Sequence, residues 1–569
     1  MRKTLVVAAL IAAGAGGYFI WQQQKTLPGN ELLLGVPADT VLFSGQLQPL
    51  DLTTYLASMG VSPNAGSADS LTQLEALLGG AEQPAQKFLL ALSKAWLALV
   101  QKPAELAQTL GLKAQQRSLF YMVGISPVVK LEVADEARFW QFFDQVEQDS
   151  GFAHEAKQLD GQAYRAYNLQ FAEDVTFSLL LRVQNGWLTL ALSSDKLPAA
   201  RLSEVLGTQP LADNLAASPA LLSMQQKYQL NPAAFGYVSF PQLSTPLVSK
   251  DANRLAQDVT SLFDAHATVG FADWRNAACQ ADVAAITKTL PGLFVSNQVS
   301  GDKVSNSMLF AIDNANSIAA LQQLQGFVPD GWQQGAYMLQ LGLGFDVGQL
   351  SAGVGKLWDQ MTTTSYQCAP LVSAQQQLKQ SNPLPMLMMA GMANGLQGMA
   401  LTVNDLEVDL VRQMPKSLDA MLSLSGDNLL ALLESAKALR PELASVTLPK
   451  AGETLDLTAQ SPELQQLGIA LKLQATDKHL VLFSGQQALE QAKALGAQPL
   501  SKNGFATLSF DYGKFFKALE QAMQVSGEPI PAELAALKDH QQRLGLQATV
   551  TTHGIQLNSN LWLNVAKAQ

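Results

Sequence analysis

A pattern of strand-like and helix-like segments occurs in both halves of this chain and constrains its fold more than any other feature. In the first copy, residues 187–191 (WLTLA) lead into a helical pattern that ends at residues 207–211 (GTQPL). In the second copy, residues 479–483 (HLVLF) lead into a helical pattern that ends at residues 496–500 (GAQPL). The glycine suits a helix C-cap, and the proline suits a chain that cannot continue the helix.

Three further pairs of segments follow the same order along the chain. Residues 130–135 (KLEVAD) match 421–427 (MLSLSGD), 235–240 (FGYVSF) match 505–510 (FATLSF), and 306–310 (NSMLF) match 558–562 (NSNLW). Such an ordered series is hard to obtain by chance. We therefore predict an α+β fold of two related halves from internal duplication, with antiparallel sheets flanked by helices, after an N-terminal transmembrane helix.

Local signals refine the two copies. Asp135 and Asp427 lie where a helix N-cap is expected, and Asn185-Gly186 is a strong hairpin signal. A length of 569 residues exceeds what one ordinary core holds. We predict a first half over residues 26–330 with a helical insertion near 70–112. The second half covers residues 331–569, with a helical start near 345–400.

Residues 1–25 are predicted to be a membrane anchor. Arg2 and Lys3 precede the uncharged stretch 5–21, which spans roughly 25 Å as a helix. The leading positive charges predict a cytoplasmic N-terminus and an exported body. We therefore expect a single-pass inner-membrane protein whose body lies in the periplasm.

Two alternatives to the anchor remain open. One is a signal peptide cleaved among the small residues 13–17, although the apolar run continues beyond them to Trp21. The other is a buried N-terminal helix of a cytosolic protein. A lipoprotein anchor is excluded because no cysteine lies near position 20.

Cys279 and Cys368 are the only cysteines. In an oxidising periplasm, such a pair is expected to form a disulfide. A redox pair or a pair of metal ligands is the functional alternative, but the chain has no Cys-x-x-Cys motif and no histidine within a few residues of either cysteine. We predict a structural disulfide.

Familiar catalytic and nucleotide-binding motifs are missing. The five histidines have neither His-x-His nor His-Glu-x-x-His spacing. The glycines of residues 342–348 and 353–356 have the wrong spacing or flanking residues for dinucleotide or phosphate loops, and we interpret them as turns or close helix packing. The net charge of −10 disfavours nucleic-acid partners. We expect no cofactor.

Methionines crowd one apolar, glycine-rich stretch, and they are Met386, Met388, Met389, Met392 and Met399. Thioether side chains adapt to apolar ligands or varied partners, and they also bind Cu(I). Core packing of a helix is the competing interpretation. Adaptable apolar contact is the functional hypothesis that we retain for these residues.

The anchor, the segment 34–40 (LGVPADT) that opens the body, and the strand–helix repeats resemble those of uncharacterised membrane-anchored bacterial envelope proteins of unknown function. This resemblance implies a membrane-attached envelope protein and assigns no site residues. We expect a non-catalytic protein that binds protein partners or apolar molecules such as lipids. The alternatives are an enzyme with a site assembled from dispersed residues, and a structural or assembly scaffold of the envelope.

Overall fold

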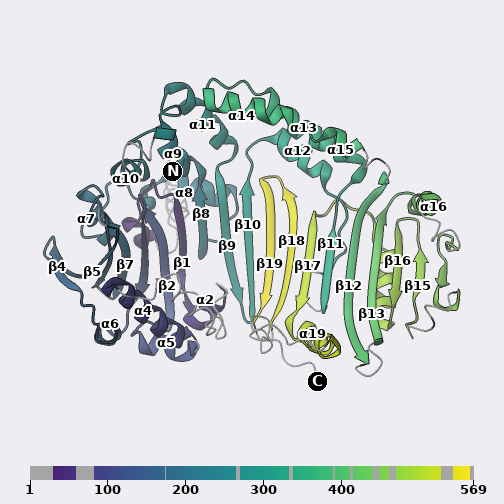
Figure 1. The fold of residues 1–569 in the computed structure, drawn as a ribbon, viewed down its shortest axis with the longest axis horizontal. Helices are drawn as coiled ribbons and strands as arrows, with labels where there is room; N and C mark the ends of the chain where they lie inside the picture. Colours follow the sequence, from purple (N-terminus) through teal and green to yellow (C-terminus); the bar gives the residue numbers. More distant parts are fainter. Residues whose placement is uncertain are drawn as a thin grey trace, which may run out of the picture. The chain divides into compact units, whose positions relative to one another are not determined.

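The computed structural model has an α+β fold, in which a large antiparallel sheet is flanked by helices, as predicted (Figure 1). It describes residues 30–58, 83–100, 102–172, 175–263, 269–331, 337–388, 391, 393–409, 414–439, 447–460, 465, 469–526 and 542–563. The chain divides into two compact units. Unit 1 comprises residues 1–276 and 294–296, and unit 2 comprises residues 277–293 and 297–569.

The strands of unit 1 pair antiparallel in the order β8–β1–β2–β3–β7–β6–β5–β4. Their bounds are β1 (Leu42–Asp51), β2 (Gln115–Val123), β3 (Ser126–Glu132), β4 (Glu155–Leu159), β5 (Gln162–Ala172), β6 (Val175–Gln184), β7 (Trp187–Ser194) and β8 (Ala234–Ser239). The turn from β6 to β7 contains Asn185 and Gly186, both at positive φ, which confirms the predicted hairpin.

Helices α4 (Pro84–Val100), α5 (Pro103–Thr109) and α6 (Glu136–Ser150) cover one face of this sheet, and α2 (Leu52–Ser58) follows β1. Phe88 of α4 is fully buried and stacks on Tyr167 of β5 with ring centroids 4.5 Å apart. Asp135 caps α6 by accepting a hydrogen bond from the backbone N–H of Arg138 at 3.1 Å, as predicted. This aromatic cluster is the main core of unit 1.

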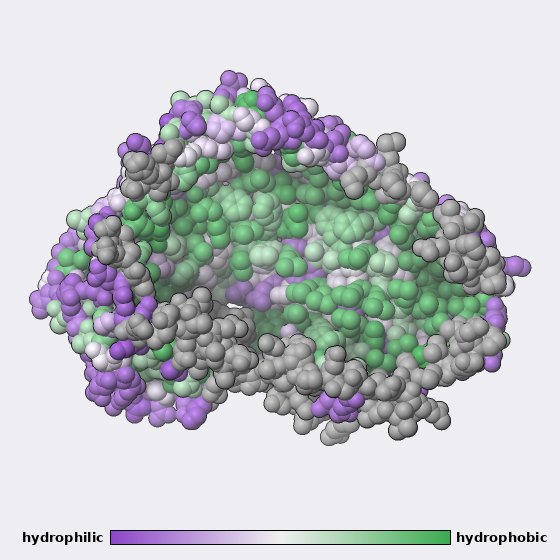
Figure 2. All heavy atoms as spheres, in the orientation of Figure 1, coloured by the Kyte–Doolittle hydropathy of each residue, from purple (hydrophilic) through white to green (hydrophobic). Residues whose placement is uncertain are grey.

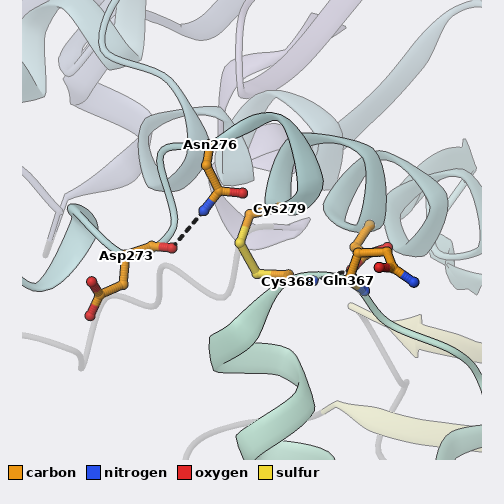
Figure 3. Close-up of a disulfide and its surroundings, with 6 residues drawn as sticks. Asp273, Asn276, Cys279, Gln367 and Cys368 are labelled. Atoms are coloured by element: carbon orange, nitrogen blue, oxygen red, sulfur yellow. Dashed lines mark hydrogen bonds between the residues drawn. A yellow bond between two sulfur atoms is a disulfide. The ribbon is translucent and has the colours of Figure 1, made fainter.

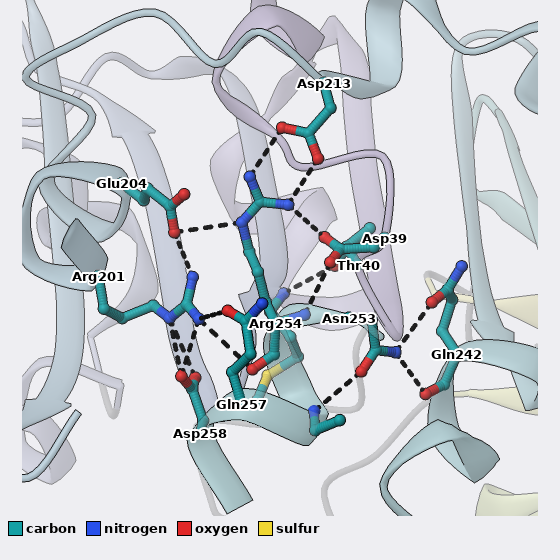
Figure 4. A network of polar contacts seen from close by, with 12 residues as sticks. Asp39, Thr40, Arg201, Glu204, Asp213, Gln242, Asn253, Arg254, Gln257 and Asp258 are labelled. Atoms are coloured by element: carbon teal, nitrogen blue, oxygen red, sulfur yellow. Dashed lines mark hydrogen bonds and ion pairs between the residues drawn. The ribbon is translucent and has the colours of Figure 1, made fainter. Parts of the chain in front are cut away.

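Helices α7 (Ala200–Leu206), α8 (Pro219–Lys227), α9 (Phe240–Val248) and α10 (Arg254–Leu262) also belong to unit 1, and a buried ion pair joins two of them. Arg201 of α7 donates through Nε and Nη2 to the carboxylate of Asp258 on α10, at 2.8–3.1 Å (Figure 4). Both side chains are almost completely buried. Asp258 Oδ2 also accepts the backbone N–H of Ile125 at 3.0 Å, so the pair also fixes the β2–β3 turn.

The same network holds the segment that opens the body. Glu204 contacts both Arg201 and Arg254, and Arg254 also binds Asp39 and Asp213 at 2.7–2.8 Å (Figure 4). The hydrogen bonds to Asp213 are the main reason why the pKa of Arg254 is raised. Asp39 therefore ties residues 34–40 to α10, which gives this segment a structural role.

The strands of unit 2 pair antiparallel in the order β10–β19–β18–β17–β11–β12–β13–β16–β15–β14, and β9 (Gly292–Ser300) pairs with β10. Their bounds are β10 (Lys303–Ala311), β11 (Leu339–Leu343), β12 (Leu396–Asp409), β13 (Met414–Gly426), β14 (Thr454–Asp456), β15 (Lys472–Ala475), β16 (His479–Ser484), β17 (Ala506–Asp511), β18 (Arg543–Thr551) and β19 (Gly554–Trp562).

One order of pairing occurs in both units. The series β8–β1–β2–β3–β7–β6–β5 in unit 1 corresponds, strand for strand, to β17–β11–β12–β13–β16–β15–β14 in unit 2. In each unit, the fifth strand of the series is followed in the chain by a helix, α7 after β7 and α18 (Gln486–Gly496) after β16.

A disulfide joins two helices of unit 2, as the cysteine count predicts (Figure 3). Cys279 lies on α11 (Ala277–Thr289), and Cys368 is the N-cap residue of α14 (Ala369–Gln380). Both cysteines are completely buried. Asp282 of α11 accepts the backbone N–H groups of Gln367 and Cys368 at 2.7 Å, so a hydrogen-bonded clamp accompanies the covalent link. The other α-helices in the described part of unit 2 include α12 (Ala315–Leu324), α13 (Leu350–Thr363), α15 (Leu384–Met388), α16 (Leu429–Leu439) and α19 (Tyr512–Ser526).

One histidine of unit 2 is buried at the start of β16. His479 on β16 lies between the Ser425 hydroxyl, 2.9 Å from Nδ1, and the Gln498 carbonyl, 2.9 Å from Nε2. A neutral ring satisfies both partners, because Nε2–H donates to the carbonyl and Nδ1 accepts from the hydroxyl. Burial lowers the pKa of His479 below its ordinary value of 6.5.

We expect Asp258→Ala to lower the free energy of unfolding of unit 1 by about 3–5 kcal/mol, because it leaves the buried Arg201 guanidinium unpaired. Chemical denaturation followed by tryptophan fluorescence measures this loss. Asp213→Ala is the control, because its side chain is 56% exposed and its ion pair is worth about 1 kcal/mol or less. Equal losses of unfolding free energy in the two variants would contradict a larger stabilising role for the buried pair.

We expect unit 2 to lose stability as the pH falls below about 6.5. The unfolded chain protonates His479 near its ordinary pKa, whereas the folded chain resists protonation because its pKa is lower. The stability contribution is therefore complete above the unfolded pKa and is lost as the pH falls toward the folded pKa. His479→Gln, which cannot titrate, should have a flatter pH profile of unfolding free energy. Parallel profiles for the two proteins would refute this assignment.

Candidate functional site

A cavity of about 550 Å³ lies in unit 1 between helices α4 and α6 and strands β3 and β7. Its lining is apolar except for one hydroxyl and consists of Leu92, Ser93, Trp96, Leu97, Leu110, Leu112, Leu131, Phe139, Phe142, Phe143, Leu188 and Leu190. The volume is within the range of small-molecule sites, about 300–1,000 Å³. Such a lining suits an apolar group without hydrogen-bonding atoms.

Helix α4 forms one wall of this cavity. The N-terminal half of α4 is fixed by the buried Phe88, and the C-terminal half supplies Leu92, Trp96 and Leu97 to the cavity wall. Trp96 remains 41% exposed, although tryptophan normally buries most of its surface in a core. The cavity is thus bordered by a large apolar side chain that is only partly covered.

Unit 2 has an apolar sheet face with several exposed side chains, which we call the apolar face. Residues directly opposite each other in an antiparallel sheet point to the same side, so the strand register defines its rows. The three rows are Ala420–Val403–Leu339–Phe510–Leu544–Leu561–Val304, Leu422–Leu401–Leu341–Leu508–Leu546–Ser559–Asn306, and Leu424–Met399–Leu343–Ala506–Ala548–Leu557–Met308. Only Ser559 and Asn306 are polar, and none of these residues is charged. Figure 2 shows this apolar surface in green over the strands of unit 2.

Exposure on the two sides of the sheet is the reverse of the usual distribution. On the apolar face, Leu341 is 43% and Met399 44% exposed. On the opposite face, Gln340, Thr402 and Ser509 are at most 2% exposed. An antiparallel sheet with one solvated face ordinarily buries its apolar side and exposes its polar side.

A chain segment at residues 325–329 helps to bury the polar side. Gln325 accepts hydrogen bonds from the Thr549 hydroxyl at 2.9 Å and from the Val550 N–H, and Asn503 binds both backbone groups of Val328. A Cβ placed on Gly342 would lie 3.7 Å from Pro329, so the segment passes directly over β11. The polar face is therefore covered by the chain itself.

The predicted methionine contacts are only partly described by the structure. Met399 lies on β12, within the apolar face, and not on a helix. Met386 and Met388 belong to the backbone of α15, and nothing is described of their side chains. Met389 and Met392 lie outside the described residues. Sequence reasoning missed the leucines around Met399, although the alternation of Leu339, Leu341 and Leu343 was visible.

A polar cavity of about 540 Å³ in unit 1 is the candidate for a catalytic site. Trp140, His154, Arg165 and Arg182 line it, and the Arg165 guanidinium lies 4.3 Å from the Trp140 ring centroid. Beside it, one Glu147 oxygen lies 2.6 Å from His154 Nδ1, 2.7 Å from the Tyr167 hydroxyl and 3.5 Å from Arg165.

That arrangement does not fit covalent or acid–base catalysis well. Glu147 accepts from several donors at once, and no serine or cysteine lies beside His154 among the lining residues. Among the described residues, no group of three or more His, Cys, Asp or Glu side chains is placed to hold a metal ion.

The glycine-rich segments pack closely, as interpreted from the sequence. A Cβ on Gly353 of α13 would lie 2.5 Å from the Leu324 side chain, and one on Gly344 would lie 2.4 Å from the Gly504 carbonyl. These glycines allow helix–helix and chain–chain contact. They do not form a phosphate loop.

Within the described part of the chain, no helix has the length and apolarity needed to span a bilayer. The predicted anchor over residues 1–25 lies outside that part. Comparison with known protein families, with curated proteins and with solved structures finds no match for this chain.

Proposed function

We propose that this chain is a non-catalytic envelope protein that binds the acyl chains of lipids. The observation that carries the proposal is the sheet of unit 2, which buries polar side chains on one side while several leucines and methionines on its apolar side are exposed. Exposed apolar surface forgoes roughly 25 cal/mol of stabilisation per Å². An occupant that covers the apolar face would recover this free energy.

An acyl chain fits the apolar face better than a protein partner does. Protein–protein interfaces of transient complexes are only about 57% apolar and contain about ten direct hydrogen bonds. The rows from β13 to β10 offer few groups for such bonds, since Ser559 and Asn306 are their only polar side chains. An acyl chain has no hydrogen-bonding group to satisfy and can follow such rows at any register.

The cavity of unit 1 supports the same chemistry independently. Its lining offers a single hydroxyl, from Ser93, and its volume can enclose a flexible apolar chain. Two apolar sites in one chain are consistent with a protein that accepts or transfers lipid.

The cellular setting belongs to the same proposal. We infer that residues 1–25 anchor the chain in the inner membrane and that the body lies in the periplasm, where the Cys279–Cys368 disulfide would persist. We also infer that the body arose by duplication. The shared order of strand pairing in the two units supports this inference, together with the sequence markers.

The double variant Leu341→Gln/Leu401→Gln tests the apolar face. These two leucines are opposite each other and exposed, so the fold should tolerate glutamine, while burial of their amides under an acyl chain would be costly. We expect full-length protein extracted gently from membranes to retain about tenfold less lipid by mass spectrometry. Met361→Gln is the control, because Met361 is similarly exposed on α13 but lies outside the apolar face. Unchanged lipid retention in the double variant, or a stoichiometric protein partner without lipid, would contradict the proposal.

A cavity-filling variant tests the site in unit 1. Ser93→Trp places a bulky ring in the cavity wall and should weaken binding of a fluorescent fatty acid about tenfold, measured by titration. Ala98→Trp adds the same ring at an exposed position of α4 that does not line the cavity, and binding should stay at the wild-type level. Equal affinities of both variants would show that the cavity takes no ligand.

A further inference from the structure

Two cationic side chains meet on the buried side of the unit 1 sheet, away from the apolar cavity. Lys130 of β3 and Arg182 of β6 flank Thr189 of β7 in one row of the strand register. Their neighbours Leu131 and Leu190 point to the opposite face and line the apolar cavity. The cations therefore belong to a separate place in the fold.

The two charges lie close together at Gly207, the left-handed C-cap residue of α7. A Cβ placed there would lie 3.6 Å from Lys130 Nζ and 3.8 Å from Arg182 Nη2. Arg182 Nη2 donates to the Gly207 carbonyl at 3.2 Å. Lys130 Nζ also lies 3.3 Å from the position that a Cβ would occupy on Gly35.

No acid neutralises this pair. Among the described residues, neither Lys130 nor Arg182 forms an ion pair, and the Lys130 ammonium has no hydrogen-bond partner. Arg182 is only 5% exposed, yet its Nε and Nη1 have no partner. The hydroxyl of the fully buried Tyr121, on a neighbouring row of the same face, is also unpartnered.

Leaving these groups unpaired costs free energy in two ways. A charge that is largely removed from water and has no counterion loses hydration free energy, and like charges close together repel. Consistent with this, burial, together with the nearby Arg182 charge, lowers the pKa of Lys130 to about 8. Each unpartnered donor adds its own desolvation cost.

We propose that Lys130, Arg182 and Tyr121 form a binding site for a phosphate-type oxyanion. A phosphoryl group carries several acceptor oxygens and can accept from an ammonium, a guanidinium and a hydroxyl at once. The ligand is a free phosphate compound or the headgroup of a phospholipid. The proposal does not rest on acyl-chain binding.

The test is thermal unfolding of the full-length protein in inorganic phosphate and, separately, in a short-chain phosphatidate below its micelle concentration, each against chloride at equal ionic strength. We expect the unfolding temperature of unit 1 to rise by about 5–10 °C at a hundredfold excess over Kd. A rise with inorganic phosphate identifies a free phosphate site. A rise with the phosphatidate alone identifies a headgroup site.

Variants decide whether these residues are responsible. Lys130→Met should abolish the rise while leaving the unliganded protein at least as stable as the wild type, because it removes a charge that is repelled. Lys196→Met, an exposed lysine of the same unit, should keep the full rise. Arg182→Met removes the second cation and should also abolish the rise, with folding of the variant checked by circular dichroism. No rise in the wild type with either probe, or an equal rise in Lys130→Met and the wild type, would overturn the proposal.

Discussion

The register of the antiparallel strands is the constraint on which the rest of this structure depends. Because side chains alternate along a strand and opposite residues share a face, each strand pairing fixes which residues lie together. In unit 2, this rule collects leucines from β11, β12, β13, β17 and β18 on one side and places Gln340, Thr402 and Ser509 on the other. A shift of one residue in any pairing would exchange the two sets.

The elements that cover each face of a sheet then determine which side chains remain available for binding. In unit 1, helices α4 and α6 cover the apolar side and leave a cavity beneath them. In unit 2, residues 325–329 cover the polar side, while many leucines of the apolar side stay exposed. Stability alone would favour the opposite arrangement, which is why the apolar face points to a ligand.

Much of the local structure could be predicted from the sequence, because it depends on neighbouring residues. The Asn185-Gly186 hairpin, the Asp135 cap and the Cys279–Cys368 disulfide were all predicted and are present. Asp427 was expected to cap a helix, but its carboxylate accepts from the side chains of Gln397 and Lys478. The predicted N-cap at Asp427 is therefore wrong, because side chains from distant parts of the chain bind the same carboxylate.

The candidate sites depend on long-range pairing and were not predicted. Leu341 and Leu401 are 60 positions apart in the chain and meet only through the β11–β12 register. The Arg201–Asp258 pair and the Lys130–Arg182 cluster likewise join distant segments. Met399 of the methionine-rich stretch lies on the apolar face, but leucines supply most of that surface.

The most direct test of lipid binding is photocrosslinking in cells that have incorporated a phospholipid with a photoreactive group in its acyl chain. Peptides of the crosslinked full-length protein are then mapped by mass spectrometry. Acyl-chain binding predicts crosslinks in β11, β12 and β13 of unit 2 and in α4 of unit 1. Crosslinks confined to residues 1–25, or absent from the body of the protein, would contradict it.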